Sequence, residues 1–255
     1  MSNIIAIVPS RLVSSRFPGK PMKKIHGMPM VGHCYHRASI AKGIDKAYVA
    51  TCDKEIYDYI LSIGGNAVMT SSSHNRAVTR SAEALENIEK MTGQVIDTVV
   101  MVQGDEPLIH PSVISETLPH FKDPSVEIVN IISHLLTKEE FESENNVKVV
   151  VNNNSDIIYY SREPIPSPWH GWEDLPRFQQ TGIIAFRRDA LIKFYNTPES
   201  SLEKIEFVDM NRVIETGGRV RAVLTHLKTL GVDIPEDLST AEALLVGDEI
   251  MSKYL

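Results

Sequence analysis

Ile4-Ile-Ala-Ile-Val8, followed directly by Pro9-Ser-Arg-Leu-Val-Ser-Ser-Arg-Phe-Pro-Gly-Lys-Pro21, is the stretch that decides the fold. The opening residues are a short apolar run, typical of a fully buried strand. The residues after them form a polar loop that contains Arg, Pro and Gly. A loop at the carboxyl end of a first strand lies where open α/β sheets bind their ligands. The sequence therefore predicts an α/β fold with a ligand site at this edge.

From this strand onward, short apolar runs alternate with amphipathic segments. Strands that alternate with helices imply right-handed βαβ units, and hence a mainly parallel sheet with helices on both faces. The residues expected in strands are 47–51, 67–70, 98–102, 126–132, 147–151, 157–161, 181–186 and 220–224. The residues expected in helices are 31–42, 55–63, 78–89, 190–195, 201–216 and 235–245.

The domain organisation is predicted from the length and from the denser strands of the second half. A chain of 255 residues is long enough for one or two domains. We expect one domain, residues 1–255, with an inserted β-rich acceptor or dimer subregion at approximately 150–186. Residues 162–178 are rich in Pro, Trp and charged side chains, so they should leave the sheet as a lid or a partner-facing segment.

Composition excludes several classes of protein. The apolar content of 42% and charged content of 23% are ordinary for a globular chain, and no apolar run approaches the ~18 residues of a membrane span. A net charge of −7 argues against a nucleic-acid partner, because phosphate backbones select basic surfaces. The N-terminus shows no secretory signal, and Cys34 and Cys52 lack metal-site spacing. We expect a cytoplasmic protein with free thiols.

The loop after the first strand carries the groups that a triphosphate requires. Converging cations, short hydroxyl donors and closely approaching backbone N–H groups bind phosphates. The loop supplies Arg11, Arg16, Ser14, Gly19 and Lys20. An ordinary solvated basic loop remains the alternative. The loop has neither the spacing of a Walker A motif nor a GxGxxG fingerprint, so ATPase and dinucleotide-binding dehydrogenase functions lose their main support.

Two aspartates follow separate strands that should end at the same edge. Asp105 follows the apolar run 98–102, and Asp233 follows the run 220–224 and a Gly. Two carboxylates beside a triphosphate suit Mg²⁺, which is usually held by a few carboxylates, phosphate oxygens and waters. Either aspartate could instead serve a turn or a helix cap.

Several motifs resemble those of one known family, in the same order along almost the whole chain. The loop Arg11-x-x-Ser14-Ser15-Arg16-Phe17-Pro18-Gly19-Lys20-Pro21 resembles the nucleotide-binding loop of the 3-deoxy-manno-octulosonate (KDO) cytidylyltransferases, which make CMP-KDO. Further similar motifs are Val102-Gln-Gly-Asp-Glu-Pro107, Asn146-Val-Lys-Val149, Tyr160-Ser-Arg162 with Ile165-Pro166, and Gly231-Val-Asp-Ile-Pro-Glu-Asp-Leu238.

The resemblance implies a Rossmann-like nucleotidyltransferase sheet, a homodimer, and Mg²⁺-dependent transfer of CMP from CTP to a small acidic acceptor such as KDO, with release of pyrophosphate, for lipopolysaccharide or surface-glycan synthesis. It implies catalytic roles for Lys20, Arg11 and Asp105, and a metal-holding pair of Asp105 and Asp233. The side chains that it implies for substrate binding are Ser14, Arg16, Gly19, His74, Arg80, Gln103, Lys148, Arg162 and Gln180. Lys148 lies in an apolar strand and needs an anion, from either the ligand or the protein.

The departures from the family pattern lie mainly on the acceptor side. A base-contacting loop that commonly reads His-x-Ser-Gly-Thr-Asp/Glu-Arg is here His74-Asn-Arg-Ala-Val-Thr-Arg80, so another base such as uracil is an alternative. Gln180 and Ile184 replace a common His and Tyr, and Met210 replaces a common Gln. The acceptor could therefore be a modified KDO, a nonulosonate or a phosphonate. A non-catalytic nucleotide-binding paralogue is a further alternative, but both aspartates are present.

Overall fold

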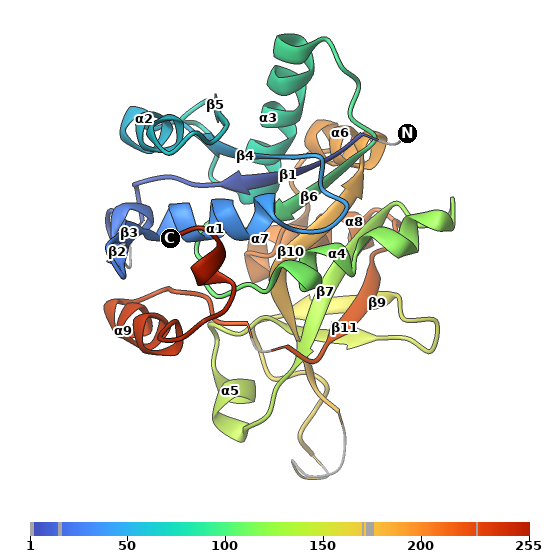
Figure 1. Cartoon of the computed structure of the whole chain (residues 1–255). Helices are drawn as coiled ribbons and strands as arrows, with labels where there is room; N and C mark the ends of the chain where they lie inside the picture. The colour runs from blue at the N-terminus through green and yellow to red at the C-terminus, as the bar shows by residue number, and fades with distance from the viewer. Residues whose placement is uncertain (1–2, 15–16, 170, 172–175, 228) are drawn as a thin grey trace.

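A mixed sheet forms the centre of the computed structural model, which describes residues 3–14, 17–169, 171, 176–227 and 229–255 (Figure 1). The strand order is β11-β7-β10-β6-β1-β4-β5, and β8 continues the sheet from β10 to β9. The strands are β1 Ile4–Pro9, β4 Lys46–Thr51, β5 Ala67–Met69, β6 Thr98–Val102, β7 Ile128–His134, β8 Lys148–Val151, β9 Ile157–Ser161, β10 Phe178–Arg187 and β11 Arg221–Thr225, with a separate hairpin of β2 Lys24–Ile25 and β3 Met28–Pro29.

The mostly parallel α/β architecture is confirmed. Along the main path, β1 pairs in parallel with β4 and β6, β4 with β5, and β7 with β11. Only β10 runs antiparallel to its neighbours β6 and β7. The strands β11, β7, β6, β1, β4 and β5 therefore end at one edge, and β10 begins there. This edge gathers loops that are far apart in the sequence.

Alternate residues of β1 pack against helices on opposite faces of the sheet. Ile5 and Ile7 belong to the cluster that includes α3, whereas Ala6 and Val8 belong to the cluster that includes α1. Because side chains alternate along a strand, a continuous apolar run is buried on both sides. The helices are α1 Met30–Ser39, α2 Lys54–Ser62, α3 Ala77–Thr92, α4 Pro111–Ser115, α5 Lys138–Glu142, α6 Arg188–Asn196, α7 Ser201–Glu206, α8 Met210–Glu215 and α9 Pro235–Leu244, with 3₁₀ segments η1 Lys20–Met22, η2 Leu118–Lys122 and η3 Met251–Lys253.

The expected helix over residues 201–216 was wrong. The structure has α7 and α8 instead, separated at Phe207, whose φ of 57° places it in the left-handed region. A helix cannot continue through a residue in that conformation. The short elements β2, β3, α4 and α5 were not expected, because segments of two to five residues carry too little periodicity.

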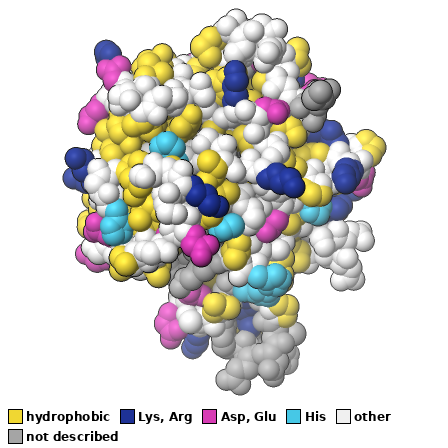
Figure 2. All heavy atoms as spheres, viewed as in Figure 1, with side chains coloured by type: hydrophobic (Ala, Val, Ile, Leu, Met, Phe, Trp, Pro, Cys, Tyr) yellow, Lys and Arg dark blue, Asp and Glu magenta, His cyan; other side chains and the backbone are white. Residues whose placement is uncertain are grey.

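The described surface mixes side chains of both charges. Figure 2 shows Lys and Arg interspersed with Asp and Glu over the face that carries α1 and α4. Among the described residues, no helix has the length and apolar content needed to cross a membrane.

Candidate active site

The loop after β1 is closed by backbone and side-chain hydrogen bonds at its base. Gly19 N donates to Leu12 O (2.9 Å), and Leu12 N donates to Asp53 Oδ2 (2.7 Å). Gly19 has a φ of 70°, which favours glycine because a Cβ would be strained there. These bonds close the loop between Leu12 and Gly19, with Ser14 inside it and Lys20 directly after it. Arg16 lies outside the described residues.

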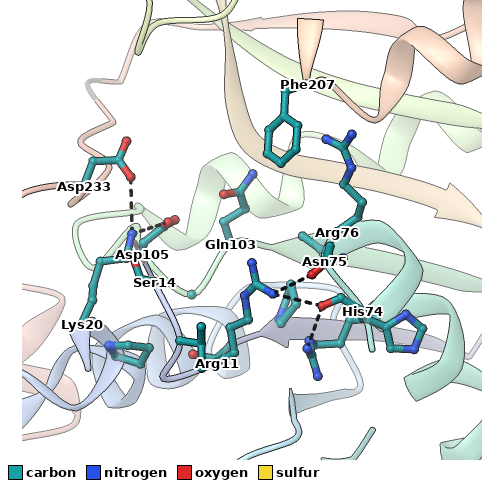
Figure 3. Close-up of a pocket in the computed structure, with 17 residues that line it drawn as sticks. Arg11, Ser14, Lys20, His74, Asn75, Arg76, Gln103, Asp105, Phe207 and Asp233 are labelled. Atoms are coloured by element: carbon teal, nitrogen blue, oxygen red, sulfur yellow. Dashed lines mark hydrogen bonds and ion pairs between the residues drawn. The ribbon is translucent and has the colours of Figure 1, made fainter. Parts of the chain in front are cut away.

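Lys20 joins the two aspartates that the sequence singles out. Its Nζ donates to Asp105 Oδ2 (2.8 Å), to Val232 O (2.7 Å) and to Asp233 Oδ1 (3.4 Å) (Figure 3). Burial lowers the pKa of Lys20, but the two carboxylates outweigh that effect and raise the pKa above its ordinary value. The structure thus brings together residues separated by more than 200 positions around one positive charge.

The backbone makes this juxtaposition tight. Val232 N donates to Asp105 O (2.8 Å), so the loops after β6 and β11 are joined directly. Gly104 allows β6 to end beside β1, because a Cβ at this position would lie 2.9 Å from Pro9 O and 3.1 Å from Ser10 Oγ. A larger residue would push these two strand ends apart.

The pair of carboxylates fits a hard divalent cation. Both reach the same ammonium nitrogen, so both can face one ion that replaces it. Over the ranges that the structure describes, no cluster of three His, Cys, Asp or Glu side chains could hold a metal. Phosphate oxygens and waters would have to complete the shell, which is the set of ligands that Mg²⁺ commonly takes.

A cavity of about 350 Å³ lies over these groups. Arg11, Ser14 and Gln103 point toward it in Figure 3. Arg11 Nη1 donates to His74 O (3.2 Å) and to Asn75 Oδ1 (3.5 Å), which connects the β1 loop with the loop before α3. The cavity wall also contains Pro9, Ser10, Val13, Lys20, Pro21, His74, Asn75, Arg76, Ala77, Arg80, Gly104, Asp105, Phe207 and Asp233.

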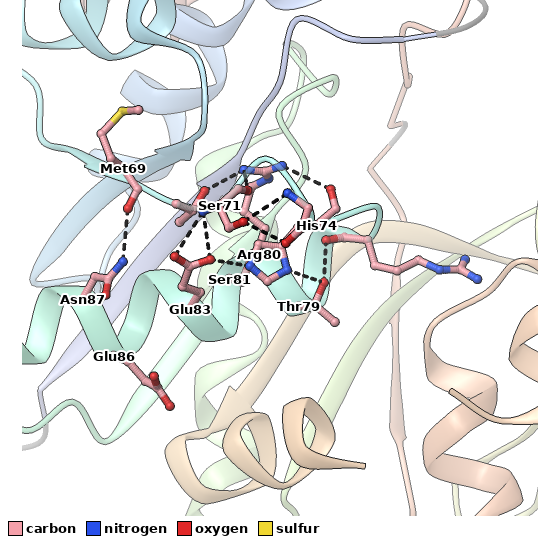
Figure 4. Close-up of polar contacts among 12 residues, drawn as sticks. Met69, Ser71, His74, Thr79, Arg80, Ser81, Glu83, Glu86 and Asn87 are labelled. Atoms are coloured by element: carbon pink, nitrogen blue, oxygen red, sulfur yellow. Dashed lines mark hydrogen bonds and ion pairs between the residues drawn. The ribbon is translucent and has the colours of Figure 1, made fainter. Parts of the chain in front are cut away.

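His74 and Arg80 line this cavity, yet most of their hydrogen bonds hold the loop itself (Figure 4). Arg80 donates from Nη1 to Thr70 Oγ1 (2.6 Å) and from Nη2 to His74 O (3.2 Å). His74 bonds through Nδ1 to Thr79 Oγ1 (3.1 Å) and through Nε2 to the Glu83 carboxylate. These two side chains therefore shape the cavity wall. A nucleotide base could bond to them only alongside the hydrogen bonds that they already make.

A second cavity, of about 590 Å³, adjoins the first. Gln103, Asp105 and Asp233 line both cavities, so the carboxylate pair lies at their common border. Gln180 lines the second cavity, and its Oε1 is buried with no hydrogen-bond partner among the described residues. A buried amide oxygen without a partner is costly unless a ligand or water satisfies it.

Arg162 reaches the second cavity from the end of β9. Its Nε donates to Glu206 O (3.0 Å) and its Nη1 to Glu144 O (2.8 Å). Two backbone carbonyls thus orient the guanidinium without neutralising its charge. The remaining Nη2 donates to no residue in the described part of the chain, and an acidic ligand could accept from it.

Lys148 lines neither cavity. Its Nζ donates to Ser143 O (2.8 Å) and to Arg162 O, and burial lowers its pKa. The partners that this ammonium group needs are supplied by the protein backbone rather than by an anion. The side chain ties the Ser143 turn to the end of β9, and its contact with substrate stays a prediction.

Glu106 lies fully inside the protein beside the carboxylate pair. Its Oε1 accepts from Gly182 N (2.6 Å), whereas its Oε2 has no partner within the described ranges. Burial, reinforced by the charge of Asp105, raises the pKa of Glu106 to about 7. The side chain anchors the middle of β10 next to the end of β6, and a Cβ on Gly182 would collide with it.

Two residues at the border of the cavities are not predicted from the sequence. Arg76 and Phe207 line both, and the Arg76 guanidinium carbon lies 3.8 Å from the centre of the Phe207 ring. Arg76 lies in the loop of residues 74–80, which differs from the family pattern. The position of Arg76 in that loop indicates no partner for its side chain. Phe207 lies inside the helix that the sequence predicts over residues 201–216, so no sequence pattern indicates that it belongs to a site.

The fold and this edge define a nucleotidyltransferase: a basic loop after the first strand, a carboxylate pair, and two adjoining cavities. The family model described as cytidylyltransferase matches residues 5–244. The chain therefore belongs to the cytidylyltransferase family, whose members are nucleotidyltransferase enzymes.

Relatives match over nearly their full length. The chain is 36% identical over 250 residues to the 3-deoxy-manno-octulosonate cytidylyltransferase of Trichlorobacter lovleyi, covering 94% of this chain and 97% of the relative. It is also 36% identical over 245 residues to the same enzyme of Flavobacterium johnsoniae, covering 95% and 98%. Among solved structures, CMP:2-keto-3-deoxy-manno-octonic acid synthetase complexed with CTP superposes with a TM-score of 0.87 and 33% identity, covering 96% of this chain and 99% of that one.

Proposed function

We propose that this protein transfers CMP from CTP to KDO, or to a KDO-like 3-deoxy sugar acid, in a Mg²⁺-dependent reaction that releases pyrophosphate. The observation that carries the proposal is the position of Asp105 and Asp233, on either side of Lys20 at the border of two adjoining cavities. A nucleotide in one cavity and an acceptor in the other would meet beside these carboxylates. The names of the relatives support CTP and KDO as the substrates.

Cations of the β1 loop position the triphosphate in this proposal. Lys20 and Arg11 line the first cavity from opposite ends of that loop, with Ser14 between them. The approach of an anionic phosphate gives Lys20 an alternative to its carboxylate partners, so its ammonium group can turn toward the leaving pyrophosphate. Positioning and charge neutralisation supply most of the acceleration in phosphorus transfer.

Asp105 and Asp233 are the residues that would hold Mg²⁺, together with phosphate oxygens and water. The bound ion supplies neutralisation of the charge that grows on the pyrophosphate as it leaves. No side chain needs to form a covalent intermediate: an acceptor hydroxyl bonds to the α-phosphorus, the bond to pyrophosphate breaks, and the hydroxyl proton passes to solvent.

The second cavity would orient the acceptor. Among the described residues nothing accepts from Arg162 Nη2 or donates to Gln180 Oε1, so the first can bond a carboxylate and the second a hydroxyl group. Gln103 lies at the border and can contact either substrate. A nonulosonate or phosphonate acceptor is the alternative, because Ile184 and Met210 give this cavity an apolar part that cannot bond hydroxyl groups.

Pyrophosphate release measures the proposed reaction directly. The purified protein is mixed with each of the four nucleoside triphosphates and with KDO, a nonulosonate or 2-hydroxyethylphosphonate, with and without Mg²⁺. We expect release only with CTP, Mg²⁺ and a sugar acid. Asp105→Asn should lower the rate at least about 100-fold, because it removes a metal-holding charge.

Asp58→Asn is the matched control, since Asp58 is exposed and pairs only with Lys54 in the described structure. Its rate should equal that of the unmodified protein. Full pyrophosphate release by Asp105→Asn would contradict the proposed site. Binding of CTP without turnover under every condition would instead favour a non-catalytic nucleotide-binding protein.

We also propose a cytoplasmic homodimer that works in lipopolysaccharide or surface-glycan synthesis, with residues 1–255 as one domain. Cys34 and Cys52 are free thiols, in keeping with a reducing compartment. Ile158 and Trp169 are 51% and 86% exposed, and exposed apolar side chains favour a contact surface. Sedimentation of Ile158→Asp against the unmodified chain tests the dimer.

A further inference from the structure

Phe207 has an unusual backbone conformation for a large aromatic residue. Its φ of 57° lies in the left-handed region, which bulky residues rarely adopt. The residue is 60% exposed although it lines both cavities. Strained residues that are maintained by the surrounding fold cluster at functional sites. In Figure 3 the Phe207 ring projects over the space above Gln103.

Arg76 covers one face of this ring and is itself held by acidic groups. Its guanidinium carbon lies 3.8 Å from the ring centre, and the residue is only 9% exposed. Arg76 Nη1 lies 3.5 Å from Asp209 Oδ1, and Nε lies 3.5 Å from Glu199 Oε1. Ion pairs on one side and a cation–π contact on the other keep the aromatic ring in one orientation before any ligand binds.

The neighbours of Phe207 place it with the acceptor rather than with the nucleotide. Val208, Asp209 and Met210, which follow it directly, line only the second cavity. Met101 and Ile184 add further apolar lining to that cavity. A ring that is open on one side beside apolar groups suits a ligand with a C–H face, since aromatic side chains contribute apolar contact at fixed geometry.

We infer that Phe207 is a specificity-determining platform on which the ring of a cyclic sugar acid stacks, with Arg76 as the residue that positions it. This inference rests on the proposed function and narrows the acceptor. A pyranose ring has a flat C–H face that can cover Phe207, whereas a short phosphonate has no ring to place there. Phe207 should thus favour a cyclic sugar acid over a linear acid, even when both carry the same charge.

The test compares two substitutions that tolerate the left-handed conformation or keep the ring. Phe207→Asn removes the ring, and Asn adopts this backbone conformation more readily than most residues. Phe207→Tyr keeps the ring. We expect Phe207→Asn to raise the KM for KDO, measured at saturating CTP, about tenfold and to leave the KM for CTP, measured at saturating KDO, unchanged. Phe207→Tyr should stay within about twofold in both.

The matched control is Ile205→Asn, because Ile205 is 76% exposed, lies two residues away and lines neither cavity. It should not change the KM for KDO. Should Phe207→Asn fail to fold, Phe207→Gly serves the same purpose at a positive φ. For Arg76, Arg76→Lys should raise the KM for KDO less than Phe207→Asn does. It should add nothing in the double variant, because both act through one ring.

The outcomes separate this inference from the proposed function. Normal turnover with an unchanged KM for KDO in Phe207→Asn, or a kcat/KM for 2-hydroxyethylphosphonate equal to that for KDO, overturns the platform and leaves the cytidylyl transfer standing. Absence of pyrophosphate release from CTP with every acceptor overturns the proposed function, and the platform with it.

Discussion

Replacement of Lys20 by Met tests the arrangement at the centre of the site. The substitution keeps the length of the side chain and removes the ammonium group that bonds Asp105 at 2.8 Å, Val232 O at 2.7 Å and Asp233 at 3.4 Å. The two carboxylates then lose the ammonium group that they share. We expect the free energy of unfolding to fall, because like charges repel and a nearly buried carbonyl loses its donor.

The size of the loss follows from the exposure of the partners. Removing one partner from a buried ion pair costs ~3–5 kcal/mol. Here the side chains of Asp105 and Asp233 are 26% and 32% exposed, so water recovers part of that cost. We expect a loss of about 3 kcal/mol, at the lower end of that range. For a chain of this size it corresponds to a Tm lower by roughly 6–12 °C.

In the absence of nucleotide, Mg²⁺ should affect the stability of the variant and of the unmodified protein differently. Lys20→Met removes the Lys20 ammonium group that competes for the carboxylates, so Mg²⁺ alone should stabilise the variant more than the unmodified protein. At a free Mg²⁺ concentration of ten times its Kd, the gain from binding is about 1.4 kcal/mol. Thermal unfolding over a MgCl₂ titration, at constant ionic strength, measures both effects.

Lys54→Met is the control for this experiment, because Lys54 is 82% exposed and pairs only with Asp58 in the described structure. Its Tm should change by less than about 2 °C, as expected for an exposed ion pair. Equal stability of Lys20→Met and Lys54→Met, or an equal rise in the Tm of both variants with Mg²⁺, would refute the role of Lys20 between the two carboxylates.

Two further predictions concern buried groups away from the reaction. Lys148→Met should lower the free energy of unfolding by about 2 kcal/mol, because the Ser143 and Arg162 carbonyls lose their donor. The KM for CTP should not change. A large increase in KM at an unchanged Tm would instead indicate that Lys148 contacts the substrate. Burial lowers the pKa of His33, which contacts Ile25 O and Tyr254 beside Arg37 and His36. The folded state therefore resists its protonation, and stability should fall as the pH drops below about 6.5, by at most ~1.4 kcal/mol per pH unit. Urea unfolding at pH 5 and pH 7 measures this slope, which should be shallower in His33→Gln; an equal slope would show that other groups cause it.

Much of the sheet and the core of the site were predictable from local patterns. The apolar runs at β1, β4 and β6 specify strands because each buries both faces, and Lys20, Asp105 and Asp233 were expected together because the ends of parallel strands meet at one edge. The helix break at Phe207 was not predictable, since residues 201–216 have continuous helical spacing and no Gly or Pro before residue 217.

The sequence also could not determine which groups each basic side chain bonds. Lys148 and Arg162 are both basic residues in similar positions near strand ends, yet the first is satisfied by backbone carbonyls and the second keeps a free Nη2 in the described structure. Charge is a property of the residue, whereas the number of carbonyls around it depends on how distant loops pack. The sequence alone thus determined the strands, the basic loop and the family. Tertiary structure alone decided which cations bind the protein itself, and it brought Phe207 and Arg76 together at the border of the two cavities.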